Sequence, residues 1–242
     1  MLEYLPKKKL ENLPKITVTK KLTFKCEYCK KSFAKESTLL VHVCELKRRH
    51  LQKTEKNVQI GYQTFVRFYQ LSAGYKGIKT YEDFCGSTFY NAFVKFGSFV
   101  GNVRPLYPEK YIDYVVTSNV KLDHWCREEM YEKYAIELIM KEGVETALER
   151  SINTMVEWAE KNNSVYNHYF NYVSINRATY DIKDGKVSPW LLLNCKSGKE
   201  LLNKLTDEQL GMIYHILNPQ HWAMRFKRQT KDVELVKQVA KE

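Results

Sequence analysis

Two cysteines and a histidine near the N-terminus constrain the fold most strongly, because they stand at a recognisable spacing. Cys26 and Cys29 are separated by two residues, and twelve residues lie between Cys29 and His42. Thiolate sulfur and imidazole nitrogen at such spacings are the ligands of tetrahedral structural zinc. A segment of about 25 residues buries too little apolar surface to fold alone, so a bound metal would supply the missing stability. The spacing therefore predicts a small module held together by Zn²⁺.

The apolar residues between these ligands extend the pattern. Phe33 and Leu39 follow the second cysteine by four and ten residues, and His42 comes three residues after Leu39. In these positions residues 24–50 resemble a variant C2H2-type zinc finger. The resemblance implies a ββα-like module, in which a hairpin surrounds the two cysteines and a helix from about Lys35 carries the histidine.

The fourth ligand is not decided by the spacing. Leu46 stands where C2H2 fingers have their last ligand, and leucine has no donor atom. His50 lies eight residues after His42, about 12 Å along an unbroken helix, so its use requires the helix to end and the chain to fold back. Cys44 requires the helix to end near His42. A short unwinding orders less chain than a longer loop, which favours Cys44, and His50 stays as the alternative.

The positive charge of the chain is concentrated around this module. The formal net charge is +11, and residues 1–56 hold 15 Lys and Arg against 6 Asp and Glu. A basic segment beside a zinc module predicts contact with the phosphates of nucleic acid, with DNA favoured over RNA. By the C2H2 resemblance Lys35 approaches a base, and the other predicted contacts are to phosphate. The predicted nucleic-acid-binding residues are Lys30, Lys31, Lys35, Lys47, Arg48 and Arg49.

The remaining chain predicts a mainly α fold. Its apolar residues recur at helical spacing, and Thr80, Pro108 and Thr206 stand where helices begin. Asp184-Gly185, between the short segments YDIK and KVS, predicts one short β-hairpin. The predicted parts are a basic N-terminal arm (1–23), the C2H2-like finger (24–50), a linker (51–57) and a mainly helical domain (58–242).

Catalytic signals are weak in the helical part. His124 and Cys126 are two residues apart, so on a helix they would face away from each other and could not form a local nucleophile and base. Asn167 and His168 lack further ligands at metal-binding spacing. We therefore expect no catalysis, and a nuclease assembled from distant residues is the weakest of the hypotheses.

The aromatic residues admit two interpretations. The chain contains 17 Tyr and 11 Phe, many of them at helical spacing, which predicts a packed core. The alternative is that some of these rings stack on single-stranded bases. The Tyr- and Lys-rich helical segments loosely resemble uncharacterised accessory proteins of large tailed bacteriophages. This resemblance implies a protein that acts in an infected host cell.

The compartment and partners follow from composition. The first residues contain no apolar stretch of signal-peptide length, and no run of about 20 apolar residues predicts a membrane span. Scattered cysteines suit a reducing interior, so we expect a cytoplasmic protein that binds nucleic acid and no membrane. The alternative function is a protein-docking adaptor in a replication, transcription or packaging complex.

Overall fold

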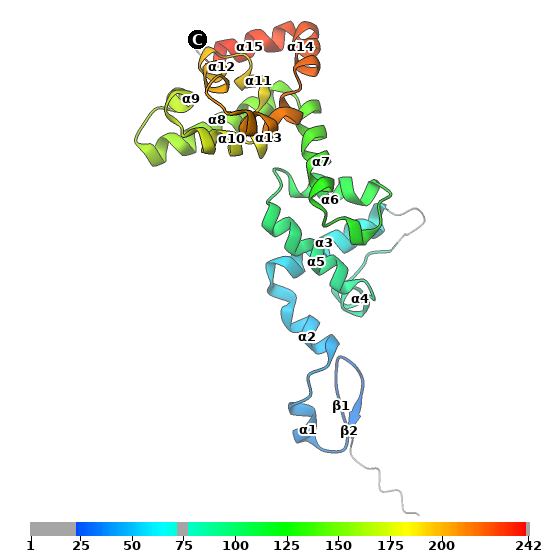
Figure 1. Cartoon of the computed structure of the whole chain (residues 1–242). Coiled ribbons are helices and arrows are strands. Elements are labelled where there is room, and N and C mark those ends of the chain that lie inside the picture. The colour runs from blue at the N-terminus through cyan, green and yellow to red at the C-terminus, as the bar shows by residue number, and fades with distance from the viewer. Residues whose placement is uncertain (1–22, 72–76, 241–242) are drawn as a thin grey trace, which may run out of the picture. The chain divides into compact units, whose positions relative to one another are not determined.

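A computed structural model describes residues 23–71 and 77–240, which form parts of two compact units. One unit spans Met1–Thr54 and the other spans Glu55–Glu242. In the described residues α-helices predominate and the two strands form a single antiparallel pair (Figure 1). The predicted mainly α fold with a small N-terminal ββα-like module is therefore confirmed. Most of the predicted basic arm lies outside the described residues.

The N-terminal module, residues 23–54, consists of short elements. Strands β1 (Phe24–Lys25) and β2 (Ser32–Phe33) pair in antiparallel register, with Phe24 opposite Phe33. They are followed by α1 (Glu36–Leu40), α2 (Glu45–Leu51) and a 3₁₀ turn (Gln52–Thr54), so part of the predicted linker is helical. Cys26, with 3% of its surface exposed, is the one fully buried residue among residues 23–54. The module therefore has almost no hydrophobic core.

The helical unit begins with a group of helices around an aromatic core. The ring of Phe65 on α3 meets that of Phe93 on α5 edge to face, with centroids 5.5 Å apart. These rings are 2% exposed, so the base-stacking alternative is wrong for them. The helices of this group are α3 (Lys56–Leu71), α4 (Tyr81–Gly86), α5 (Tyr90–Val103) and α6 (Pro108–Thr117), followed by a 3₁₀ turn (Leu122–His124).

Two glycines let α3 and α5 lie against each other backbone to backbone (Figure 1). A Cβ atom on Gly97 would stand 2.0 Å from the carbonyl oxygen of Asn57, and one on Gly61 would stand 2.8 Å from that of Phe93. Any larger residue at either position would push the helices apart. The pairing of these helices thus depends on the absence of two side chains.

The remaining helices surround a second hydrophobic core. At its centre Trp190 meets Trp222 edge to face, with ring centroids 5.8 Å apart, and both are 0–1% exposed. No helix among the described residues offers an apolar stretch long enough to cross a bilayer. The helices around this second core are α7 (Glu128–Lys141), α8 (Val144–Asn162), α9 (Tyr169–Tyr172), α10 (Ile175–Lys183), α11 (Pro189–Leu192), α12 (Lys196–Leu202), α13 (Asp207–Leu217), α14 (Pro219–Arg228) and α15 (Thr230–Ala240), with a 3₁₀ turn (Tyr166–His168).

The predicted helix starts are confirmed. Thr80 and Thr206 each cap a helix, and each forms a reciprocal capping box with the side chain three residues later. Pro108 occupies the first turn of α6. The two threonines satisfy backbone N–H groups that otherwise lack a partner at a helix start, and Pro108 has no N–H that would need one. Local sequence therefore sufficed to find all three.

The hairpin predicted at Asp184-Gly185 is wrong. The segment before it is the end of α10, and Asp184 is the C-terminal cap of that helix. Gly185 adopts a left-handed backbone, with φ of 72°, and its N–H donates to the carbonyl oxygen of Ile182 at 2.9 Å. A left-handed glycine ends helices as readily as it turns hairpins, so the dipeptide alone could not distinguish the two.

A buried ion pair ties the helical unit together. The guanidinium of Arg150 donates to both carboxylate oxygens of Glu142, at 2.6 and 2.8 Å. Ser188 Oγ donates to the same carboxylate at 2.8 Å, and Arg150 Nε donates to the carbonyl oxygen of Gly185 at 2.7 Å. The two side chains are 12% and 4% exposed, so the pair is buried with most of its hydrogen bonds satisfied.

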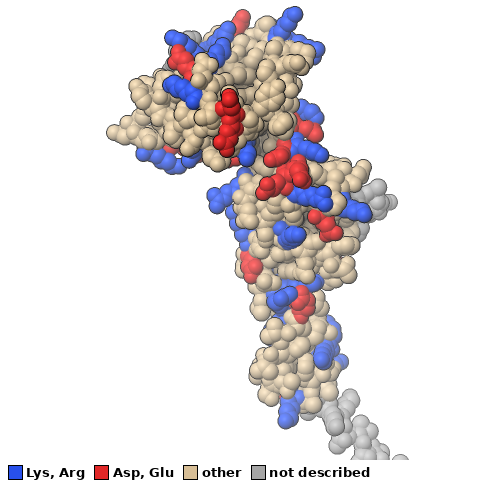
Figure 2. All heavy atoms as spheres, in the orientation of Figure 1, with Lys and Arg blue, Asp and Glu red and all other residues tan. Residues whose placement is uncertain are grey.

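Charge is distributed differently over the two units. Figure 2 shows basic and acidic side chains intermingled on the visible face of the helical unit. Residues 23–54 hold eight Lys and Arg against three Glu. The N-terminal module is therefore basic in its own right.

Candidate metal centre

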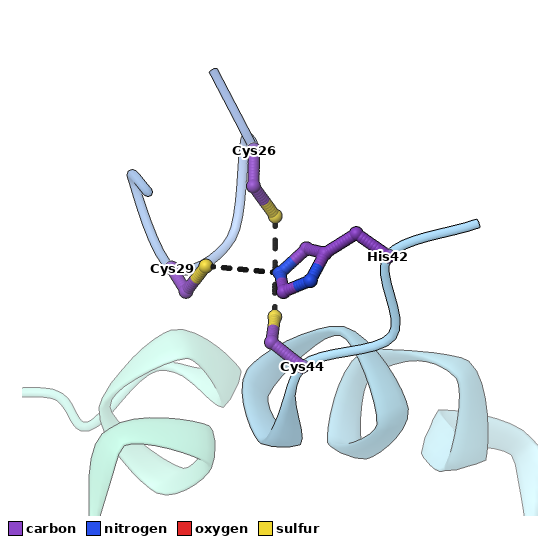
Figure 3. A group of neighbouring side chains, drawn as sticks. All are labelled: Cys26, Cys29, His42 and Cys44. Atoms are coloured by element: carbon purple, nitrogen blue, oxygen red, sulfur yellow. Dashed lines mark hydrogen bonds between the residues drawn. The ribbon is translucent and has the colours of Figure 1, made fainter. Parts of the chain in front are cut away.

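Four side chains of the N-terminal module converge on one point. They are Cys26, Cys29, His42 and Cys44, whose three sulfur atoms and one imidazole nitrogen all lie within 4.8 Å of one another (Figure 3). Among the described residues this is the one group of His, Cys, Asp and Glu side chains close enough to hold a metal ion. Two ligands come from the turn after β1, and the other two come from the segment around the start of α2.

The distances between the ligand atoms fit tetrahedral coordination of an ion. The Cys26 and Cys44 sulfurs are 3.9 Å apart, and Cys29 Sγ is 3.3 Å from His42 Nε2. Metal–ligand bonds of about 2.3 Å to sulfur and 2.1 Å to nitrogen give tetrahedral edges of roughly 3.8 Å and 3.6 Å. Four protein ligands leave no coordination position for a substrate or water, which is the character of a structural site. The donor set can hold a metal ion and is consistent with zinc.

A tight turn aims the first two sulfurs. The N–H of Cys26 donates to the carbonyl oxygen of Lys31, and the N–H of Lys30 donates to that of Cys26, both at 2.9 Å. Lys30 closes the turn with a left-handed backbone, φ 61°, which is uncommon for a residue with a side chain. This turn holds Cys29 close enough to Cys26 for both thiols to face the same ion.

A helix break positions the other two ligands. Helix α1 ends at Leu40, and the β-branched residues Val41 and Val43 on either side of His42 disfavour its continuation. Cys44 then caps the start of α2, where its sulfur accepts a hydrogen bond from the N–H of Lys47 at 3.4 Å. The chain thus unwinds locally at the point that a ligand at position 44 requires.

The sulfurs influence one another's protonation. The backbone N–H of Cys29 is the main cause that lowers the pKa of the Cys26 thiol. The N–H of Lys31 lowers the pKa of the Cys29 thiol, but burial and the neighbouring sulfurs of Cys26 and Cys44 outweigh this hydrogen bond. The pKa of Cys29 is therefore raised. Close thiolates repel one another, so a cation between them would favour the ionised form of all three.

His50 does not join the cluster. It lies on α2, where its ring packs on that of Tyr28, with centroids 4.9 Å apart. The ring of His42 packs on Phe33, at 4.7 Å, while its Nε2 faces Cys29. The structure therefore brings Cys44 to the other three donors, whereas His50 packs α2 against the turn that holds Cys26 and Cys29.

The predicted nucleic-acid contacts fall into two groups. Lys30, Lys31 and Lys35 are exposed around the cysteine turn and the start of α1. Lys47, Arg48 and Arg49 lie on α2 and are engaged within the module. The Lys47 ammonium donates to the carbonyl oxygen of His42 at 3.3 Å, and the two arginines share the carboxylate of Glu45, at 2.7 and 3.1 Å.

The candidate nucleophile Cys126 shows no activation. Burial raises the pKa of the Cys126 thiol, which is the opposite of what a nucleophilic cysteine needs. Trp125, between His124 and Cys126, is 1% exposed and donates through its indole N–H to the carbonyl oxygen of Val120 at 2.9 Å. This segment is part of the packing of the helical unit.

Sequence reasoning missed one feature of the module surface. Leu40, Val41 and Val43 are 73%, 77% and 68% exposed, in a stretch where the C2H2 resemblance implied a continuous helix. The signal that was available is the pair of valines around His42, which disfavours a continuous helix.

Comparison of the chain with protein-family models, with curated proteins and with solved structures finds no match. The likeness to a zinc finger therefore rests on the ligand cluster and the short hairpin of this chain. The resemblance of the helical part to phage accessory proteins stays a prediction.

Proposed function

We propose that the N-terminal module binds one zinc ion and uses its basic surface to bind nucleic acid, with DNA favoured. The observation that carries the proposal is the convergence of Cys26, Cys29, His42 and Cys44 within a module rich in lysine and arginine. Three thiolates and one imidazole at tetrahedral distances are a donor set typical of structural zinc. The ion holds the surface in shape, and the surface makes the contact.

Charge supports a polyanionic partner. Eight basic residues against three acidic ones give residues 23–54 a net charge of +5. Three thiolates and one Zn²⁺ together add one negative charge, so the loaded module keeps a charge of about +4. A surface of this charge attracts phosphates and releases their counterions on binding. The affinity would then fall steeply as salt is added.

The lysines near the cysteine turn are the best candidates for phosphate contact. Lys30, Lys31 and Lys35 are exposed, whereas Arg48 and Arg49 share a carboxylate with which a phosphate would have to compete. The first three therefore carry more of the proposed contact than the arginines of α2. Because exposed ion pairs are weak, the arginines could still exchange Glu45 for a phosphate, but the competition leaves them the smaller share of the contact.

The metal is tested by counting zinc in the purified full-length protein. We expect one zinc per chain in the wild type and in His50→Gln, and a reduced content in Cys44→Ser, because serine replaces a thiolate ligand. Zinc that is retained in Cys44→Ser and lost in His50→Gln would move the fourth ligand to His50 and contradict the proposed site.

Nucleic-acid binding is tested with charge-matched variants across a salt series. Replacing Lys30, Lys31 and Lys35 with Gln should weaken DNA binding and reduce the slope of log affinity against log salt by about one unit per lost contact. The control replaces three exposed lysines of the helical unit, Lys133, Lys161 and Lys204, with Gln. Equal losses in both triple variants would show that total charge, and not this module, governs binding.

A second candidate is a protein-docking adaptor. It is favoured by the exposure of Leu40, Val41 and Val43, because apolar side chains at a surface often mark contact with another protein. Binding to a protein partner through these residues would depend little on salt. Absence of DNA binding by the zinc-loaded protein, even at low salt, would remove the first candidate and leave this one.

A further inference from the structure

An exposed aliphatic segment surrounds the ligand His42. It consists of Leu40, Val41 and Val43, each between 68% and 77% exposed, at the end of α1 and in the short segment that follows. Leaving three aliphatic side chains of one short segment in water forfeits the stabilisation that burial would give. The segment is therefore suited to contact a ligand surface that is itself apolar.

A positive charge is fixed beside this segment. The Lys47 ammonium donates to the carbonyl oxygen of His42 at 3.3 Å, and His42 stands between Val41 and Val43 in the chain. The surface thus combines aliphatic side chains with a cation held at a defined place. It suits a ligand in which apolar faces alternate with anionic groups, as the bases and phosphates of a nucleic-acid strand do.

Helix α1 is poorly suited to read a duplex. It has five residues, which span about 8 Å, whereas the major groove of B-DNA is about 12 Å wide. Fingers of the C2H2 type read bases from the positions before the helix and at its third and sixth residues. Counted from Glu36 these positions hold Lys35, Thr38 and Val41. A valine cannot form the hydrogen bonds that distinguish most base edges.

We infer that the module prefers an unpaired nucleic-acid strand, whose bases pack against Leu40, Val41 and Val43 while the neighbouring Lys47 contacts a phosphate. Base faces are covered by stacking in a duplex and exposed in a single strand, so aliphatic contact to them is available in the unpaired form. This inference rests on the proposed nucleic-acid function and narrows its substrate class.

The test compares a short oligothymidylate strand with a mixed-sequence duplex of equal phosphate count, using the zinc-loaded full-length protein. The variant carries Leu40→Gln, Val41→Thr and Val43→Thr. These changes keep a side chain of similar size at position 40 and a β-branched side chain at positions 41 and 43. The matched control carries Ile78→Thr, Val165→Thr and Leu210→Gln, at exposed aliphatic positions of the helical unit. Zinc content is measured for each, so that a damaged metal site is recognised.

We expect wild-type protein to bind the single strand more tightly than the duplex. The aliphatic variant should bind the single strand about tenfold more weakly, the loss expected if roughly 60 Å² of apolar surface is no longer buried. Its duplex affinity and zinc content should stay unchanged, and the control should behave as wild type.

Other outcomes separate the inference from the function on which it rests. Equal binding of both forms, with an aliphatic variant that behaves as wild type, would overturn the inference and leave salt-dependent nucleic-acid binding intact. Failure of the wild type to bind either form would overturn both. Loss of binding to anionic lipid vesicles in the aliphatic variant, without a strand preference in the wild type, would assign the segment to a membrane surface and overturn the inference.

Discussion

Replacing Gly97 with alanine should separate α3 from α5, while the same replacement at Gly101 should stabilise the protein. Both glycines lie on α5, four residues apart. A Cβ on Gly97 would stand 2.0 Å from the carbonyl oxygen of Asn57 and 2.9 Å from the backbone nitrogen of Gly61, whereas a Cβ on Gly101 meets nothing within 4 Å. The two substitutions therefore differ in steric cost while they share most other effects.

The magnitude follows from these contacts. Alanine in a helix is favoured over glycine by about 1 kcal/mol, and both variants gain this term. At position 97 the contacted atoms belong to the backbone, so no side-chain rotation relieves the clash and the helices must move apart by more than about 1 Å. Overpacking of this kind costs about 3 kcal/mol, at the upper end of the usual range. We expect Gly97→Ala to lose roughly 2 kcal/mol of unfolding free energy and Gly101→Ala to gain roughly 1.

Thermal unfolding of the full-length protein, followed by circular dichroism, measures the difference. For a protein of this size 1 kcal/mol corresponds to about 2–4 °C, so the two melting temperatures should differ by roughly 6–12 °C. Equal melting temperatures would show that the helices do not approach as closely as Gly61 and Gly97 indicate, and would refute the reasoning.

Two further predictions concern buried groups of the helical unit. Arg150→Met should lower the free energy of unfolding in urea by about 3–5 kcal/mol, because it leaves the carboxylate of Glu142 buried without its cation. The double variant Glu142→Leu, Arg150→Met should recover part of that loss. An Arg150→Met variant as stable as the wild type would contradict this prediction. Burial, assisted by Asp184, raises the pKa of Tyr131 to about 12. The unfolded chain ionises this phenol near pH 10, so its contribution is fully present below about pH 10 and is lost as pH rises toward 12. Tyr131→Phe should flatten the fall of unfolding free energy over this interval, and an unchanged pH profile would argue against the assignment.

The features that sequence predicted are those set by neighbours in the chain. The ligand spacing identified Cys26, Cys29 and His42, which the structure brings together, and Thr80 and Thr206 were recognisable as caps because the groups that they satisfy lie within three residues. Even the preference for a ligand at position 44 followed from local chain ordering. In each case the decisive interaction lies within a short stretch of sequence.

The features that sequence could not predict depend on distant residues. Gly61 and Gly97 are unremarkable until α3 and α5 are known to pair, and Arg150 meets Glu142 through side chains brought together by packing. The error at Gly185 has another origin. A left-handed glycine serves helix ends and hairpin turns alike, so the Asp-Gly dipeptide by itself predicts neither.

The near absence of a core in the N-terminal module has a consequence for how a cell would control it. Since Cys26 is the one fully buried residue among residues 23–54, the proposed ion would take the place of a hydrophobic interior. The folded fraction of the module would then follow the supply of metal, and each tenfold change in available ion would alter its stability by about 1.4 kcal/mol. Chelation should melt the module, as measured by proteolysis of residues 23–54, while the helical unit stays intact. The chain would thus contain an N-terminal module whose stability depends on metal supply and a helical unit whose stability does not.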